Sequence, residues 1–378
     1  MTGNWKKILY VATSDIHLKS FHIPYLKWLS EEGHMVEIAA ENRGGLSIDF
    51  VHRTHWMPFP RKLGSIQNIK TFYRLRSLIE AGNYDLVHCH TPIPSALTRL
   101  AARKWRRKGG KLIYTAHGFH FYRGGPLKNW LLYYPAEWIL SSFTDTIVTI
   151  NKEDFGYAQD RMRNAKSFLI PGIGVDTDRF KPVSSGENRR VRHELGLADD
   201  DFILLYVAEF IPRKNHEFLI DALPELLKKI PNLKLLLAGR GILFEECKAQ
   251  AGSKNLEDVV HFLGFRTDLP KLAAVTDVAV SSSRHEGLGL ALVEQMLCEV
   301  PVIASEDRGH REFVTDGETG YLFAHGDKKA FQARVTELFN CRKLRDKLGK
   351  SAQHSALEFS IENSLEKMKH IYLEHLSD

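Results

Sequence analysis

Residues 278–294 have the sequence VAVSSSRHEGLGLALVE, and this stretch decides the fold. A buried strand, Val278–Ser283, is expected first, followed by a loop with two glycines and a helix near residues 290–298. The order of apolar strand, polar loop and amphipathic helix recurs along the whole chain. Continuously apolar strands that alternate with helices are typical of parallel sheets buried on both faces. The pattern therefore predicts an α/β protein.

The strands fall into two similar sets, which we place at 7–12, 35–40, 86–90, 111–116 and 146–150, and at 202–208, 234–239, 259–264, 278–283 and 302–305. At 378 residues the chain has room for two domains. We predict two Rossmann-like, doubly wound parallel-sheet domains that face each other across a cleft. Residues 1–171 form the first, residues 172–201 a linker rich in Gly, Pro, Ser and Asp, and residues 202–378 the second. The last helix is expected to pack back on the first domain.

The formal charge of +6 is unevenly distributed. Residues 1–180 hold 25 Lys and Arg against 15 Asp and Glu, whereas residues 181–378 hold 27 against 31. An anionic partner is therefore expected for the first half. The sequence contains no recognition module for nucleic acid, so we exclude that partner.

The four cysteines are far apart in the sequence, and no apolar run is long enough for a signal peptide or a membrane span. We expect a cytoplasmic protein with reduced thiols. Contact with a membrane would then be peripheral, on the inner face of the cell membrane.

The loop before the helix near residue 290 suits a phosphate or a sugar. Unpaired N–H groups at a helix start carry the positive end of the helix dipole. Glu286 lies just before this seat, and Glu294 follows eight residues later. The alternative is an ordinary helix cap with a surface glutamate.

A second candidate is the loop after the strand 202–208, where Arg213 and Lys214 are adjacent. Two cations at the end of a strand suit a leaving diphosphate. A solvated basic turn is the alternative.

Histidines mark the first half. His117, His120 and Arg123 follow the strand 111–116, and His17 and His22 follow the first strand. We interpret His17, His22, His120 and Arg123 as candidates to line an acceptor site, although histidines held in ordinary loops give the same pattern. Zinc is not expected, because Cys89 lies between His88 and His90 and no second cysteine completes a usual spacing.

Cations and aromatic residues adjoin one another in the first half, as suits the headgroup zone of an anionic bilayer. The candidates for this contact are Arg103, Lys104, Arg106, Arg107, Lys108 and Trp130. A solvated helix face beside a core helix is the alternative.

Together these motifs resemble the family-four retaining glycosyltransferases, which have the GT-B fold. The resemblance covers almost the whole chain and rests on Glu286 with Glu294, Lys214 in its loop, and residues 174–180, 264–266, 301–305 and 316–321. Residues 21–26 and 115–121 are similar to a bacterial subgroup that builds capsule, exopolysaccharide or glycan precursors.

The resemblance implies roles for single residues. Glu286 would face the donor sugar, and backbone N–H groups at Gly287, Leu288 and Gly289 would hold the sugar and the diphosphate. Glu294 would bind the ribose.

Three further roles follow from the resemblance. Lys214, assisted by Arg213, would neutralise the diphosphate. The main chain at Arg266 would contact the base, and His117 would lie against the reacting sugar. The catalytic residues would then be His117, Glu286 and Lys214. One departure is Glu209, which stands where many members have arginine.

The implied function is transfer of a hexose or N-acetylhexosamine from a UDP-sugar, with retention of configuration. The acceptor would be a saccharide, free or carried on a polyprenyl diphosphate, in bacterial polysaccharide or glycan synthesis. We expect no prosthetic group and no protein-bound metal. The alternatives are a UDP-sugar epimerase on the same fold, or a non-catalytic component of a polysaccharide assembly complex that binds nucleotide-sugar.

Overall fold

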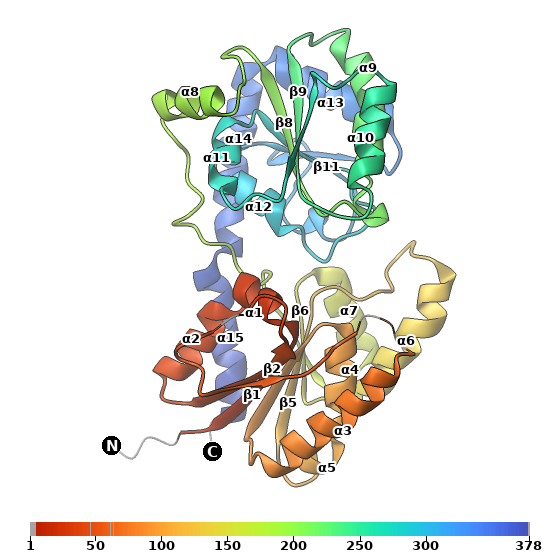
Figure 1. Cartoon of the computed structure of the whole chain (residues 1–378), viewed down its shortest axis with the longest axis vertical. Helices are drawn as coiled ribbons and strands as arrows, with labels where there is room; N and C mark the ends of the chain where they lie inside the picture. The colour runs from red at the N-terminus through yellow and green to blue at the C-terminus, as the bar shows by residue number, and fades with distance from the viewer. Residues whose placement is uncertain (1–4, 46, 61, 63, 377–378) are drawn as a thin grey trace. The chain divides into compact units, whose positions relative to one another are not determined.

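A computed structural model describes residues 5–45, 47–60, 62 and 64–376, and the chain divides into two units, each with one parallel sheet (Figure 1). Unit 1 comprises Met1–Gly174 and Ile361–Asp378, and unit 2 comprises Val175–Ser360. The predicted α/β class with two doubly wound sheets is confirmed.

Unit 1 has a seven-stranded sheet in the order β3-β2-β1-β4-β5-β6-β7. The strands are β1 (Lys7–Ser14), β2 (Met35–Glu41), β3 (Arg53–Trp56), β4 (Leu86–His90), β5 (Lys111–Ala116), β6 (Thr146–Thr149) and β7 (Lys166–Leu169). Its helices are α1 (Asp15–Phe21), α2 (Ile23–Glu31), α3 (Ile66–Ala81), α4 (Pro92–Ala101), α5 (Arg103–Arg106), α6 (Leu127–Ser141), α7 (Lys152–Arg161) and α15 (Ile361–Leu376).

The two faces of this sheet differ in chemistry. Leu9 and Val11 point to one face and share an apolar core with Leu75 of α3. Tyr10 points to the other face, where β4 presents His88 and α15 presents Tyr372. Adjacent strand residues alternate between faces, so the same strands supply an apolar core on one side and a polar, aromatic layer on the other.

Unit 2 has a six-stranded sheet in the order β10-β9-β8-β11-β12-β13. The strands are β8 (Phe202–Val207), β9 (Leu233–Ala238), β10 (Val260–Gly264), β11 (Val278–Ser281), β12 (Val302–Ser305) and β13 (Gly320–Phe323). The helices are α8 (Ser185–Glu194), α9 (His216–Leu227), α10 (Phe244–Ser253), α11 (Leu269–Val275), α12 (Leu290–Leu297), α13 (Lys328–Asn340) and α14 (Arg342–Ala356). The carboxyl ends of β8 and β11 carry the two loops singled out in the sequence.

The unit boundaries lie at Gly174 and Ile361, whereas the sequence suggested residues 171 and 202. The predicted linker, residues 172–201, contains α8, which packs against α11. Val191 of α8 is buried in a small apolar cluster with Ile203 and Leu236 of the sheet. Part of the predicted linker therefore belongs to unit 2. Within the described residues, no helix combines the length and the apolar character that a membrane span requires.

Because α14 approaches the chain after α12 closely, we expect that no side chain fits at Gly349 without a loss of stability. A Cβ atom at Gly349 would lie 2.0 Å from the carbonyl oxygen of Glu299. Gly349→Ala should therefore lower the free energy of unfolding by about 1–3 kcal/mol through overpacking, measured by thermal unfolding. Gly156 lies in α7, where a Cβ would meet nothing within 4 Å. Gly156→Ala is the matched control and should be neutral or stabilising by about 0.4–1 kcal/mol. Equal effects at the two glycines would contradict the expected close packing of α14.

Candidate functional site

A buried carboxylate and two cations form the centre of the site in unit 2. Arg213 donates from Nη1 to Oε2 of Glu286 at 2.7 Å, and Lys214 Nζ bonds the other oxygen, Oε1. Ser283 donates from Oγ to Oε1 at 2.5 Å. The structure therefore brings together three of the residues predicted from two separate loops.

The two loops are joined by main-chain bonds as well as by charge. Arg284 donates its N–H to the carbonyl of Arg213 at 2.8 Å. Ser282 donates from Oγ to the carbonyl of Asn215 at 2.8 Å, and Tyr206 donates to that of Lys214 at 2.9 Å. Because these bonds fix the backbone on both sides, the Cα atoms of Arg213 and Lys214 are held within side-chain reach of Glu286.

Glu286 stays ionised although it is only 7% exposed. Burial raises the pKa of a carboxyl group, but the charges of Lys214 and Arg213 outweigh it and lower the pKa of Glu286 to about 2. His310 contributes to the same lowering of the pKa. One anion with two cations leaves this centre with a net positive charge at neutral pH.

The start of α12 lies directly after Glu286, Gly287 and Leu288. Gly289 precedes the helix with φ of +104°, a backbone conformation that favours glycine. A Cβ at Gly309 would lie 2.8 Å from the carbonyl oxygen of Leu288, so the neighbouring loop approaches this turn closely. The first N–H groups of a helix have no partner within the helix, and here they lie next to the positive centre.

Glu294, the second predicted glutamate, lies on α12 itself. Burial raises the pKa of Glu294 to about 7, and the charge of Arg179 only partly opposes this. A neutral or easily protonated carboxyl accepts and donates hydrogen bonds, which suits paired hydroxyl groups.

Arg266, predicted to contact the donor, and Glu209, the departure from the family pattern, lie in loops of unit 2. Arg266 forms an ion pair with Asp268, with Nη2 to Oδ2 at 2.6 Å, so its side chain is engaged and its main chain remains as the predicted contact. Glu209 is exposed. Arg213, four residues later, is the arginine that reaches Glu286.

Unit 1 has a pocket of about 500 Å³ at the carboxyl ends of its strands. It is lined by Thr13, Ser14, His17, Arg43, Phe59, Thr91, Pro92, Ile93, Pro94, His120 and Tyr133. Of the predicted acceptor residues, His17 and His120 line this pocket. His22, which follows α1, is buried and does not line the pocket. Arg123, in the loop after β5, is exposed and does not line it either.

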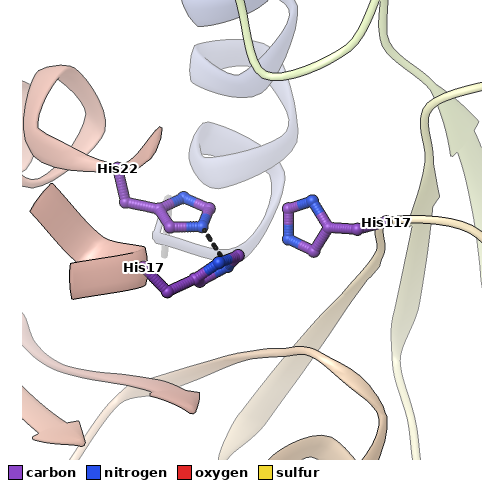
Figure 2. A group of neighbouring side chains, drawn as sticks. All are labelled: His17, His22 and His117. Atoms are coloured by element: carbon purple, nitrogen blue, oxygen red, sulfur yellow. Dashed lines mark hydrogen bonds between the residues drawn. The ribbon is translucent and has the colours of Figure 1, made fainter. Parts of the chain in front are cut away.

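Five histidines gather on the polar face of the same sheet. The rings of His17 and His22 lie side by side, with Nε2 atoms 3.2 Å apart, and His117 faces them from the loop after β5 (Figure 2). His90 Nδ1 lies 3.3 Å from Nε2 of His117, and the ring of His88 lies 4.1 Å from that of His90. Figure 2 shows that the three histidines drawn come from separate segments of the chain.

Burial keeps these imidazoles uncharged. It lowers the pKa of His17 to about 4 and that of His88 to about 3. It also lowers the pKa of His22, His90 and His117 well below the usual value, with further lowering from the neighbouring histidines. These histidines lie in separate stretches of the sequence, and their spacing does not predict that they form one cluster.

Some of the residues predicted to contact a membrane are exposed, whereas others interact with neighbouring side chains of the protein. Lys104, Arg107 and Lys108 are exposed, while Arg106 pairs with Asp145 at 2.7 Å. The Arg103 guanidinium lies 4.4 Å from the centre of the Phe143 ring.

Trp130 differs from the expectation of an exposed anchor. It is half-buried, and its Nε1 donates to the carbonyl of Tyr122 at 3.1 Å. The reason is an aromatic cluster with Phe121 and Tyr157, which holds the indole against the protein. The exposed apolar side chains of α6 are instead Leu127, Leu131, Leu132, Trp138 and Ile139, each 51–72% exposed.

Two residues of the unit 2 site were missed. Ser283 donates from Oγ to Glu286, and His310 donates from Nδ1 to the carbonyl oxygen of Ser305 at 2.7 Å. Both follow strand ends at the same sheet edge as Glu286. Arg213 and Lys214 were predicted because they follow a strand end, and the same criterion applied to Ser283 and His310 would have predicted these two residues as well.

We expect the burial of Glu294 to make stability depend on pH. The pKa is about 7 in the folded chain and about 4.3 in the unfolded chain. The native state therefore holds the extra proton between these values, and stability falls as pH rises through this window. Glu294→Gln, which cannot ionise, should be more stable than the parent at pH 8 by about 1–3 kcal/mol and equal to it near pH 4.

Unfolding curves at the two pH values measure this difference. Glu318 is an exposed glutamate of the same unit, so Glu318→Gln is the control, whose stability relative to the parent should differ little between the two pH values. A Glu294→Gln variant with the same relative stability at both pH values would show that the carboxyl is not held in its protonated form.

Two family profiles match the chain in succession. Residues 25–179 match Glycosyltransferase Family 4, and residues 187–355 match Glycosyl transferases group 1.

Among relatives, the putative glycosyltransferase EpsD of Bacillus subtilis is 44% identical over 97% of this chain and 96% of its own length. A UDP-Gal:alpha-D-GlcNAc-diphosphoundecaprenol alpha-1,3-galactosyltransferase of Escherichia coli is 26% identical over 83% of this chain and 81% of its own. The fold is shared with HepE of Anabaena, solved in complex with UDP and glucose, at a TM-score of 0.80 and 21% identity over 98% of this chain and all of that one. The recognition from sequence is thus confirmed, and the chain belongs to the family-four glycosyltransferases, with the GT-B fold.

Proposed function

We propose that this glycosyltransferase moves a sugar from a UDP-sugar to a saccharide acceptor with retention of anomeric configuration. The observation that carries the proposal is the centre formed by Glu286, Lys214 and Arg213 at the start of α12. It combines net positive charge for a diphosphate with a carboxylate that stays ionised for sugar hydroxyls.

The chemistry assigned to this centre is stabilisation of the leaving diphosphate. As the sugar becomes oxocarbenium-like, negative charge grows on the phosphate oxygens, where Lys214, Arg213 and the N–H groups at Gly287, Leu288 and Gly289 would meet it. Glu286 would orient the sugar hydroxyls and Glu294 the ribose hydroxyls. Since the sequence identifies no nucleophile, we favour departure and attack on the same face of the sugar, assisted by the phosphate.

A UDP-linked donor is supported by the relatives. The Escherichia coli relative is named for UDP-galactose, and HepE was solved with UDP and glucose. We therefore assign UDP-hexose or UDP-N-acetylhexosamine to unit 2, with the main chain at Arg266 as the contact for the base.

We assign the acceptor to unit 1, where His17 and His120 line a pocket of about 500 Å³. The Escherichia coli relative is named for an acceptor on diphosphoundecaprenol, which supports a polyprenyl-diphosphate-linked saccharide in polysaccharide or glycan synthesis. The roles of His117 against the reacting sugar, and of His22 and Arg123 at the acceptor, stay predictions.

A lipid-linked acceptor favours a protein that works in the cytoplasm against the inner face of the cell membrane. The cations of α5 adjoin the end of α6, since Arg103 and Arg107 line a hollow of about 240 Å³ with Ser142 and Phe143. Leu131 and Leu132 are exposed on α6. Exposed apolar residues beside cations suit an anionic interface.

The donor assignment is tested by ligand binding and by transfer. UDP-sugars should raise the unfolding temperature, whereas GDP- and ADP-sugars should not, because a ligand that binds only the folded state stabilises it. Lys214→Ala and Glu286→Gln should each lower transfer to a synthetic polyprenyl-diphosphate saccharide by about 100-fold or more. Nuclear magnetic resonance of the product gives its anomeric configuration.

The matched controls are Lys228→Ala and Glu225→Gln, which disrupt an exposed ion pair of the same unit. Both should transfer at the parental rate, and circular dichroism checks that all variants fold. Full activity of Lys214→Ala or Glu286→Gln would contradict the assignment. Epimerisation of the donor without any acceptor would favour the epimerase, and binding without turnover would favour the non-catalytic component.

Membrane contact is tested by flotation with liposomes that contain phosphatidylglycerol. Reversing Lys104, Arg107 and Lys108 to Glu should weaken binding by about 100-fold, because each cation contributes about 1 kcal/mol near an anionic surface. Leu131→Ser with Leu132→Ser should also weaken it.

The control reverses Arg189 and Arg190, two exposed cations of unit 2. This variant should float like the parent, and liposomes of zwitterionic lipid alone should bind the parent weakly. Parental flotation of the Lys104, Arg107 and Lys108 variant would contradict the membrane surface proposed here.

A further inference from the structure

We propose that unit 1 contains a binding site for a divalent transition metal ion such as Zn²⁺, with His17, His22 and His117 as its protein ligands. This inference goes beyond the proposed glycosyl transfer and does not rest on it. It revises the expectation from sequence that the chain holds no metal.

The spacing of the ring nitrogens carries the proposal. Ligand nitrogens bound to zinc lie about 2.0–2.1 Å from the ion, which places two of them about 3.3 Å apart at a tetrahedral corner. The Nε2 atoms of His17 and His22 are 3.2 Å apart. A nitrogen of His117 lies within 4.8 Å of both, so closure on an ion needs a shift of about 1 Å.

The three ligands converge from separate segments of the fold. His17 lies in α1, His22 stands between α1 and α2, and His117 follows β5. Figure 2 shows the ring of His117 turned toward the pair formed by His17 and His22. The Nε2 atoms of His17 and His22 now bond each other, and an ion between them would replace this contact.

The surroundings of the ligands are those of a supported metal site. The Nδ1 atom of His22 lies 2.9 Å from the hydroxyl oxygen of Tyr10, and this bond leaves Nε2 to face the other histidines. His90 lies behind His117, with Nδ1 3.3 Å from Nε2 of that residue. A partner on the second ring nitrogen, as Tyr10 is for His22, fixes the tautomer and the orientation of a ligating histidine.

The chemistry of the ligands selects the ion. Imidazole nitrogens bind Zn²⁺, Cu²⁺, Ni²⁺ and Fe²⁺, whereas Mg²⁺ and Ca²⁺ prefer oxygen ligands. Three protein ligands leave a tetrahedral ion one open position. Because His17 also lines the pocket of about 500 Å³, an ion has a route of entry, and we expect water or an oxygen of a pocket ligand in the open position.

The test uses the full chain without an affinity tag, stripped of metal by a chelator and titrated with Co²⁺ and then with Zn²⁺. We expect one Co²⁺ per chain, with the intense visible absorption of tetrahedral coordination, and loss of this absorption as Zn²⁺ displaces it. Calorimetry gives the affinity for Zn²⁺. Sugar transfer is not part of the readout, so failure of the proposed function and failure of this site are distinguishable.

Variants assign the site to its ligands. His17→Gln and His117→Ala alter half-buried side chains, and each should weaken Zn²⁺ binding by more than about 100-fold. His52→Ala removes an exposed histidine of the same unit and should bind Zn²⁺ like the parent. Circular dichroism of the metal-free variants checks folding, and His17→Asn is a second substitution should His17→Gln misfold. Absence of stoichiometric binding, or equal binding by His17→Gln, His117→Ala and the parent, would overturn the proposal.

Discussion

The buried carboxylate of Glu286 is the constraint on which the unit 2 site depends. An ionised carboxyl with little exposure needs compensation, and it obtains this from Lys214 and Arg213 on one loop and Ser283 on its own. The sheet makes this pairing feasible, because β8 and β11 are neighbours and their carboxyl ends deliver both loops to one edge. The helix α12 then begins where the charge is concentrated. The order of the strands therefore decides where the two loops lie, and the position of the loops decides where the charges meet.

Much of this arrangement was predictable, because it follows from apolar runs and their order. The buried strands, such as β8 and β11, are almost continuously apolar, so the sequence alone predicts a parallel α/β architecture. The strands β3, β7 and β13 were missed. Each forms an edge of its sheet and pairs on one side only, and β3 and β7 carry polar residues at half or more of their positions. The helix α8 was placed in a linker because polar residues dominate it, and only Val191 and its cluster on the sheet make it part of unit 2.

In the candidate sites too, residues whose position follows from the neighbouring sequence were predicted, whereas contacts that depend on the tertiary fold were not. Glu286, Lys214 and Arg213 were found because each lies in the loop that follows a strand, and strand ends converge in any parallel sheet. The convergence of His17, His22 and His117 depends on how α1 is anchored and how the loop after β5 turns, neither of which a spacing in sequence encodes. Tryptophan is a residue type typical of membrane interfaces, yet Trp130 packs against Phe121 and Tyr157 and is therefore half-buried.

The division of the chain at Gly174 and Ile361 has a consequence for biosynthesis. Unit 2 is continuous in sequence, whereas unit 1 needs α15, the helix that ends at Leu376. That helix supplies Tyr372, whose hydroxyl bonds Nδ1 of His88 at 2.7 Å on the polar face of the seven-stranded sheet. As the ribosome makes the chain, this sheet emerges first but lacks part of its cover until the last helix follows. Unit 2 is thus the first to have all its residues, and the histidine-bearing face of unit 1 gains the cover of α15 only after unit 2 has been made.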